Sequence, residues 1–205
     1  MKSNCLFLFV FILFFANSCT KQKSNEFFID VEGNRYRTVK IGDKIWMAEN
    51  LKVTVNPKGE KLDCVLVYRN DQNNIIKYGR LYRWTAAMQA CPEGWHMPTK
   101  TEWEQLVEML GGVEQAGAKL KSLETWDVPN TGASNETGFS GLAAGFEYDG
   151  KFIALGKHGD FWGMISDTAS FSVCLYHDGA YIKLMEDNDR EVPISFSVRY
   201  VKNRK

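Results

Sequence analysis

The chain has 205 residues, and its 25 Lys and Arg residues balance its 25 Asp and Glu residues, so its formal net charge is zero. This balance excludes the basic surface that nucleic-acid-binding proteins need. Six Trp, eight Tyr and thirteen Phe residues predict either a core rich in irregular loops or an aromatic binding surface.

Residues 1–18 have the pattern of a cleaved export signal. The apolar run Leu6–Ala16 is about eleven residues long, whereas a helix that spans a bilayer needs roughly 20. Small Ala16 and Ser18 precede Cys19 by three positions and one position, an ending that resembles a bacterial lipobox. An ordinary secretory signal that contains a Cys is the alternative. We expect a lipoprotein whose mature chain starts at an acylated Cys19, anchored on the extracytoplasmic side of the cell envelope, in the outer membrane.

The rest of the chain divides into a short arm and one domain. Residues 19–26 are polar apart from Cys19 and predict a flexible tether. Residues 27–205 suffice for a single core, so we expect one domain there. Three short β-prone runs separated by turn residues predict a small antiparallel meander at its start. These runs cover residues 27–31, 36–41 and 45–47.

The middle of the chain predicts a loop followed by helices. Residues 54–76 mix Asn, Asp, Lys and Gly with few apolar anchors, so we expect an extended loop. Residues 81–90 carry apolar and small residues at helical spacing. A second helix is predicted to start at a capping box, in which Thr99 and Glu102 satisfy each other's unpaired amides, and to end at Gly111-Gly112. Its apolar stripe consists of Trp103, Leu106, Val107 and Leu110.

We interpret residues 90–112 as scaffold rather than as an active site. The capping box accounts for Glu102 without any acid–base role, and we expect His96 to be a structural hydrogen-bonding residue. The chain contains no Gly-x-Ser-x-Gly nucleophile motif. We therefore expect a protein that is not an enzyme.

The second half of the chain predicts antiparallel β-structure. Asp149-Gly150 and Asp178-Gly179 separate apolar runs and have the chemistry of two-residue hairpins, since both residue types tolerate positive φ. In the last run, apolar residues alternate with Ser and Arg, which predicts one buried face. The runs cover residues 139–146, 151–155, 171–176, 181–185 and 194–201.

The cysteines and histidines do not form a metal-binding pattern. Once the signal is removed and Cys19 is acylated, only Cys64, Cys91 and Cys174 remain, which allow at most one internal disulfide. The three His residues are far apart in the sequence and show no ligand spacing. We expect neither a metal nor a cofactor.

Several motifs in one order resemble the Fibrobacter succinogenes major paralogous domain, a module of bacterial secreted proteins and surface lipoproteins. The resemblance covers residues from about 27 to 203. The segment GWHMPTKTEWE is also similar to an element of the formylglycine-generating enzyme superfamily, whose fold is a variant of the C-type lectin fold. The resemblance implies an α+β, C-type-lectin-like fold with two helices beside a twisted, irregular antiparallel sheet. The motifs are VKIGDKIWMAENL, YGRLYRWTAAMQACPEGWHMPTKTEWEQLVEMLGG, AGAKLKS, NETGFSGLAAGF and FSVRYVKN.

Departures from these families limit what can be transferred. The family usually ends with Val-Arg-Cys-Val, but Tyr200 replaces that Cys, so the implied bridge to Cys91 cannot form. Formylglycine-generating enzymes need two cysteines close together late in the chain, where only Cys174 stands. Calcium-dependent lectins use Glu-Pro-Asn or Gln-Pro-Asp, and Val128-Pro129-Asn130 lacks the carboxylate.

These observations favour a non-catalytic, membrane-anchored binding or adhesion module, with an extracellular glycan or protein as its partner and no nucleic acid. The alternatives are an enzyme distantly related to formylglycine-generating oxidases and a structural subunit of a surface assembly. We expect the ligand to meet a loop surface formed by residues 125–137 and 157–168, because recognition usually lies on loops held by a rigid scaffold. Glycines 159 and 163 flank a Trp there and would leave room for a partner. The candidate ligand-binding residues are Trp126, Asn130, Asn135, Asp160, Trp162 and Asp167.

Overall fold

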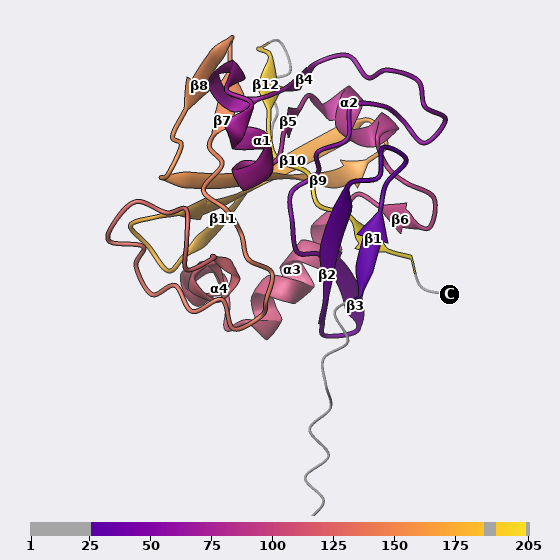
Figure 1. Ribbon diagram of the computed structural model, residues 1–205. Helices are drawn as coiled ribbons and strands as arrows, with labels where there is room; N and C mark the ends of the chain where they lie inside the picture. Colours follow the sequence, from indigo (N-terminus) through magenta and orange to yellow (C-terminus); the bar gives the residue numbers. More distant parts are fainter. Residues whose placement is uncertain (1–25, 187–191, 204–205) are drawn as a thin grey trace, which may run out of the picture.

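The computed structural model describes residues 26–186 and 192–203, which form an α+β fold (Figure 1). The α+β class is as predicted, whereas the signal peptide at 1–18, the lipid site Cys19 and nearly all of the tether lie outside the described residues. The helices are α1 (Asn73–Tyr78), α2 (Trp84–Gln89), α3 (Lys100–Met109) and α4 (Val113–Leu120). The strands are β1 (Phe27–Ile29), β2 (Arg35–Ile41), β3 (Lys44–Met47), β4 (Val65–Leu66), β5 (Leu81–Tyr82), β6 (Trp95–His96), β7 (Phe146–Tyr148), β8 (Lys151–Ile153), β9 (His158–Ser166), β10 (Ala169–Tyr176), β11 (Ile182–Glu186), β12 (Ile194–Ser195) and β13 (Val201–Lys202).

The predicted N-terminal meander forms one side of a sheet with the order β1-β2-β3-β13-β6. Strands β1, β2 and β3 pair in sequence, and β13 from the end of the fold joins antiparallel between β3 and β6. Val201 is the residue that meets both Trp46 of β3 and His96 of β6. The first and last strands of the fold therefore belong to the same sheet.

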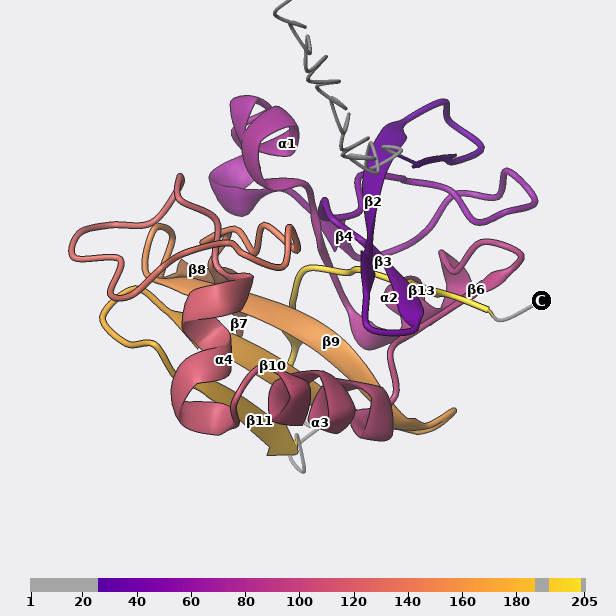
Figure 2. The same ribbon diagram turned by 90° about the horizontal axis from the view of Figure 1, so that it is seen from below.

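A second sheet, with the order β11-β10-β9, carries helices α3 and α4 on one face (Figure 2). Helix α3 begins at the predicted capping box, in which Thr99 and Glu102 bond reciprocally. Its apolar stripe is buried as expected. The buried core on this face contains Phe171 and four rings that pack largely edge to face, those of Trp46, Trp103, Phe139 and Phe161.

Strand β9 links the two halves of the core because it is buried on both faces. Phe161 points into the core under α3, while the next residue, Trp162, belongs to a second core with Tyr82 and Phe196. Along one edge β9 pairs with β10, and along the other it hydrogen-bonds to Ser197. The strand therefore has neither a free face nor a free edge at its centre.

Other expectations from the sequence are met in part. The turn at Asp149-Gly150 joins β7 to β8, and both residues have positive φ as predicted. Residues 54–76, predicted as a loop, contain β4, a 3₁₀ turn at Tyr68–Asn70 and the start of α1, so that expectation is wrong in part. The predicted strand at 194–201 is interrupted: its ends are β12 and the start of β13, and between them only Phe196 and Ser197 form single bridges, to Tyr82 and Phe161.

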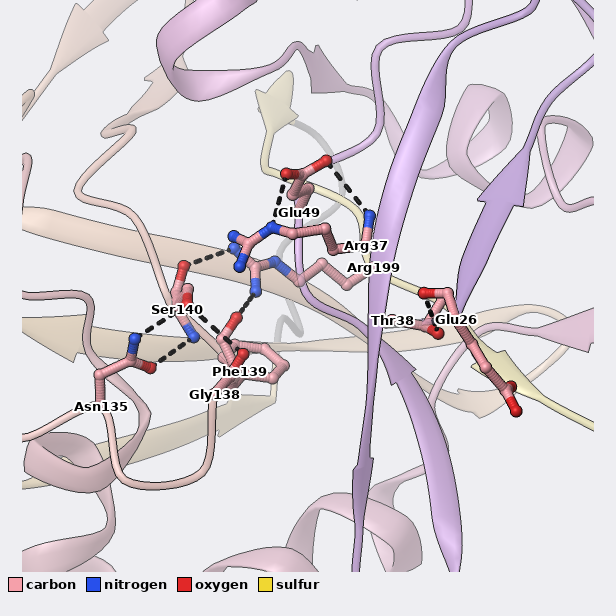
Figure 3. Close-up of polar contacts among 9 residues, drawn as sticks. All are labelled: Glu26, Arg37, Thr38, Glu49, Asn135, Gly138, Phe139, Ser140 and Arg199. Carbon is pink, nitrogen blue, oxygen red and sulfur yellow. Dashed lines mark hydrogen bonds and ion pairs between the residues drawn. The ribbon is translucent and has the colours of Figure 1, made fainter. Parts of the chain in front are cut away.

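Two buried cations hold the long loop of residues 121–145 between α4 and β7. The Arg199 guanidinium donates to the carbonyl oxygens of Phe139 and Ser140 and lies 4.3 Å from the centre of the Phe139 ring (Figure 3). At the start of the loop, the Lys121 ammonium donates three 2.9 Å hydrogen bonds to backbone carbonyls. Burial lowers the pKa of Lys121 to about 8, so the group stays protonated at neutral pH. The carbonyls belong to Thr131, Tyr176 and Gly179.

Candidate functional site

Residues 157–168 were expected to form a loop. That expectation is wrong, because most of them form strand β9. Trp162 is only 1% exposed, and its indole N–H donates to the Tyr82 carbonyl at 2.7 Å. The flanking glycines do not leave room for a partner. A Cβ at Gly163 would lie 2.3 Å from the Phe171 ring, and one at Gly159 would lie 2.5 Å from the Leu142 carbonyl oxygen. These glycines accommodate the protein's own packing.

The other predicted ligand residues are not gathered on one surface. Trp126 is half-buried, and its indole N–H donates to the Gly141 carbonyl. The amides of Asn130 and Asn135 bond within the long loop, to the Ser122 carbonyl and to Ser140. These side chains serve the loop's own conformation.

Asp160 and Asp167 lie in opposite environments. Asp160 is buried in β9, where burial raises its carboxyl pKa to about 7, and one of its oxygens has no hydrogen-bond partner among the described residues. Asp167 is exposed in the turn that joins β9 to β10. Of the six predicted residues, only Trp162 lines one of the larger surface clefts described next.

An open cleft of about 370 Å³ lies where α2, β9, β10 and the chain around β12 meet; we call it the Trp84 cleft. The rings of Trp84 and Trp162 meet edge to face with their centres 5.5 Å apart. Because Trp162 is locked in the core, it fixes the ring of the more exposed Trp84. The cleft is lined by Cys64, Arg83, Trp84, Thr85, Trp162, Ser170, Val192, Pro193 and Ile194.

The Arg83 side chain brings a positive charge to this aromatic wall. Its Nη2 lies 3.3 Å from the Glu147 carboxylate, which is buried and also accepts hydrogen bonds from Ser195 and from the Gly150 amide. The Arg83 Nε is buried without a hydrogen-bond partner in the described part of the chain. The ion pair with Glu147 therefore holds the guanidinium in place at the cleft, and the buried Nε is out of reach of a ligand. Together with the exposed Thr85 hydroxyl, it can meet the polar edge of a ligand whose flat face rests on Trp84.

A second groove, of about 450 Å³, contains the charged cluster around His96. His96 Nε2 lies 2.9 Å from both oxygens of Glu102, Lys44 Nζ lies 3.1 Å from the same carboxylate, and His96 Nδ1 lies 2.6 Å from Asn203 Oδ1. Burial alone would raise the pKa of Glu102, but hydrogen bonds from His96, the Thr99 amide and Lys44 lower it to about 2. Such a carboxylate is a poor proton acceptor, so the cluster braces the start of α3, in line with the expected structural role of His96.

The described residues contain three free thiols and no group of three or more His, Cys, Asp or Glu residues suited to a metal ion. Burial raises the pKa of Cys91 to about 12 and also raises that of Cys174. Neither thiol is therefore a ready nucleophile. Cys64, in contrast, is exposed at the rim of the Trp84 cleft.

Sequence reasoning missed Arg83, Trp84 and Thr85, three consecutive residues of the cleft. A large aromatic residue in the first turn of a short helix, between a cation and a hydroxyl, was the available signal. The remaining walls come from segments far apart in the sequence, so no local pattern marks them.

Comparison with known proteins adds one match. The Fibrobacter succinogenes major domain matches residues 39–202 of the chain. No curated protein and no solved structure matches it. Across residues 26–186 and 192–203, no helix has the length and apolar character needed to cross a membrane.

Proposed function

The chain belongs to the Fibrobacter succinogenes major domain family, and from this premise we propose that it is a non-catalytic binding module. In this proposal the Trp84 cleft holds the ligand, and lipid on Cys19 keeps the domain at the extracytoplasmic face of the outer membrane. The family match covers most of the domain. It carries no activity with it, so the proposal rests on the chemistry of the cleft.

The observation that carries the proposal is the fixed pairing of an aromatic wall with a cation in an open cleft. Trp84 is braced by Trp162, and Arg83 is braced by Glu147, so neither group has to be ordered when a ligand arrives. Concave sites with apolar walls and a few oriented polar groups are the usual form of small-ligand sites. A sugar ring has one apolar face and a rim of hydroxyl groups, which suits this arrangement, so we propose a glycan as the ligand.

Support for the anchor comes from the sequence alone. The run Leu6–Ala16 and the lipobox-like residues before Cys19 are the pattern of an acylated export signal. A diacyl or triacyl anchor holds a protein on a bilayer firmly, whereas a single chain does not.

We further propose that the fold is a C-type-lectin-like variant. Its support is the sheet that carries two helices on one face and the long loop of residues 121–145, which the fold places before the last strands. In such a fold the binding face is formed by the long loop, and here that loop is occupied with internal hydrogen bonds. The Trp84 cleft would then be a site that this chain has added elsewhere on the fold.

The test is to screen the mature lipoprotein against panels of glycans and cell-surface proteins, and to titrate the strongest binder. Trp84→Ala is expected to weaken binding about 5- to 150-fold, equivalent to about 1–3 kcal/mol, since a central aromatic anchor is lost. Tyr148→Ala is the matched control, because Tyr148 is an exposed aromatic residue outside the cleft.

The proposal fails if Trp84→Ala binds with wild-type affinity, or if Tyr148→Ala loses as much affinity as Trp84→Ala does. A protein rather than a glycan as the strongest binder would keep the cleft and change the ligand class. Thermal unfolding of each variant should accompany the titration, so that a loss of fold is not read as a loss of binding.

A further inference from the structure

The first strand of the fold and the turn after it expose large apolar side chains at three alternate positions. Phe27 is 40% exposed, Ile29 is 61% exposed and Val31, just after the strand, is 58% exposed. Phe28 between Phe27 and Ile29 points the other way, stacks on Tyr36 and contacts the Trp95 ring at a tilt. The exposed residues are therefore not a disordered end: they are held in place by a strand whose other face is anchored in the core.

Ile29 and Val31 also line an apolar groove of about 300 Å³, and Phe27 lies next to it in the chain. The groove gathers three chain segments, the residues of β1, residues 51–57 and residues 90–93. We call Phe27, Ile29, Val31 and this groove the β1 surface. The apolar groove residues besides those of β1 are Val31, Leu51, Val53, Val55, Pro57, Ala90 and Pro92.

Two of the three acidic groups of this surface, Asp30 and Glu32, are engaged with neighbouring groups, while the third, Glu93, is exposed at the groove and stays in water in this arrangement. The Asp30 carboxylate accepts hydrogen bonds from the Tyr36 hydroxyl at 2.7 Å and from the Asn34 amide group at 2.9 Å. Glu32 accepts hydrogen bonds from Thr54. On the outer face, the Arg35 guanidinium lies 3.4 Å from the centre of the Phe27 ring. An Arg beside a Phe suits a bilayer interface, where the ring enters the acyl boundary and the cation stays at the headgroups.

The position of β1 in the chain keeps this surface close to the expected lipid anchor. Only seven residues separate Cys19 from Phe27, and an extended chain spans at most about 3.3–3.6 Å per residue, so Phe27 lies within roughly 30 Å of the lipid. A domain of this size has a radius of gyration of roughly 16 Å and a diameter of about 40 Å, which exceeds that reach, so the β1 end of the domain stays near the membrane. We propose that the β1 surface rests on the phospholipid bilayer that holds the Cys19 anchor. This inference rests on the anchoring part of the proposed function and is independent of the Trp84 cleft.

A second copy of the chain is a less suitable occupant. β1 is the edge strand of its sheet, but it is only three residues long, and short edge strands offer few groups for pairing with another chain. The bilayer, in contrast, is always within reach of the tether.

The test uses the mature lipoprotein, purified from cells and reconstituted in vesicles of phosphatidylethanolamine and phosphatidylglycerol that contain a photoactivatable phospholipid. Crosslinked peptides are identified by mass spectrometry. We expect crosslinks to concentrate on residues 26–35. The double variant Ile29→Ser/Val31→Ser should lower them about tenfold, because the apolar groups that enter the interface are lost.

The matched control is Ile76→Ser/Val128→Ser. These two residues are 83% and 89% exposed, more than Ile29 and Val31, and neither lines the groove. This variant should leave the crosslinks on residues 26–35 unchanged. Equal loss in both variants would overturn the inference.

Two further outcomes separate this inference from the anchor itself. In one outcome, the protein floats with the vesicles and carries the acyl mass on Cys19 but is crosslinked evenly over its surface. The assignment of the β1 surface to the bilayer would then be wrong, while the lipid anchor would stand. A protein that neither floats nor carries acyl groups overturns the anchor and this inference together. Crosslinks between the β1 strands of two copies would assign the surface to a second chain, and the bilayer assignment would then be wrong.

Discussion

Helix α3 and the long loop of residues 121–145 are both well-fixed parts of the molecule, but they are fixed over very different distances along the chain. The capping box of α3 joins residues three positions apart. The loop is held by Arg199, whose carbonyl partners lie 59 and 60 positions away, and by Lys121, two of whose partners lie 55 and 58 positions away. One region is specified locally, and the other depends on the completed fold.

This contrast shows how a loop without regular structure can be as ordered as a helix. Backbone carbonyls in a buried loop need donors, because an unpaired buried carbonyl costs free energy. A helix supplies its own donors. The long loop receives them from a guanidinium in the segment between β12 and β13 and from an ammonium at the end of α4.

The largest loss of stability is expected where α3 and the long loop meet. Trp103 of α3 is 1% exposed, and its ring contacts those of Trp46 and of Phe139 from the long loop. Trp103→Ala should lower the free energy of unfolding by about 3–5 kcal/mol through the cavity it leaves. Chemical denaturation measures this loss.

Trp103→Phe is the informative control for that change. The Trp103 indole N–H is buried with no hydrogen-bond partner among the described residues, so Phe removes an unsatisfied donor while keeping most of the ring volume. Its cost should stay below about 1.5 kcal/mol. A loss as large as that of the Ala variant would mean that the N–H has a partner after all.

Arg199→Met should destabilise the long loop most. It leaves the Phe139 and Ser140 carbonyls and the Asn50 side-chain oxygen without their donor. The net cost should be about 3 kcal/mol, because the three lost hydrogen bonds outweigh the relief from burying a charge. Denaturation together with hydrogen exchange should show the loss, with the amides of residues 135–141 exchanging faster than those of α3.

Arg37→Met serves as the matched control for that variant. Figure 3 shows Arg37 beside Glu49, in a pair that is 3.0 Å long and solvent-exposed. Its loss should cost less than about 1 kcal/mol. If the two Arg variants were equally stable, the buried cation would not be what holds the loop.

Lys121→Met tests the other end of the loop and should cost about 2 kcal/mol. Met keeps the aliphatic length of Lys, but the carbonyls of Thr131, Tyr176 and Gly179 lose their shared donor. Denaturation midpoints measure the effect. A variant with wild-type stability would show that water replaces the ammonium without loss.

The same contrast explains what the sequence could predict. The capping box, the first meander and the Asp149-Gly150 turn are confirmed, because each depends on residues close together in the chain. Strand β9 was predicted as a loop. It is buried on both faces, so it lacks the alternation that marks a half-buried strand, and its glycines and Asp160 look like turn residues.

The candidate site was harder to predict than the fold. The Trp84 cleft combines residues near positions 64, 84, 162, 170 and 193, and only the folded chain brings them together. Trp162 was chosen for its ring and its flanking glycines. In the structure the Trp162 ring is buried at the inner wall of the cleft, and the ring exposed in the cleft is that of Trp84.

Thr99→Ala isolates the local part of the stabilisation of α3. The hydroxyl accepts from the Glu102 amide at 3.2 Å, and Glu102 accepts from the Thr99 amide at 2.9 Å. Loss of the hydroxyl should cost about 1 kcal/mol, while Thr99→Ser should cost much less because it keeps the cap. Equal losses in the two variants, measured by denaturation, would assign the effect to the methyl group rather than to the cap.

The smallest effect, and the one that depends on pH, is expected from His96→Gln. The hydrogen bond with Glu102 raises the pKa of His96 above its ordinary value of 6.5, so its contribution to stability is full below about pH 6.5 and is lost as the pH rises through the raised pKa. The pKa of Glu102 is lowered from 4.5 to about 2, so its contribution is full above about pH 4.5 and is lost as the pH falls towards 2. The stability difference between wild type and His96→Gln should therefore be greatest between about pH 4.5 and 6.5, at no more than about 1 kcal/mol, and should shrink at higher pH.

His158→Gln is the control with the opposite sign, because burial lowers the pKa of His158 and disfavours its charged form in the fold. As the pH falls below about 6.5, wild type should lose stability relative to the His158 variant. Urea denaturation across this pH range separates the two trends, and parallel curves for the two variants would mean that Glu102 does not hold the charge of His96.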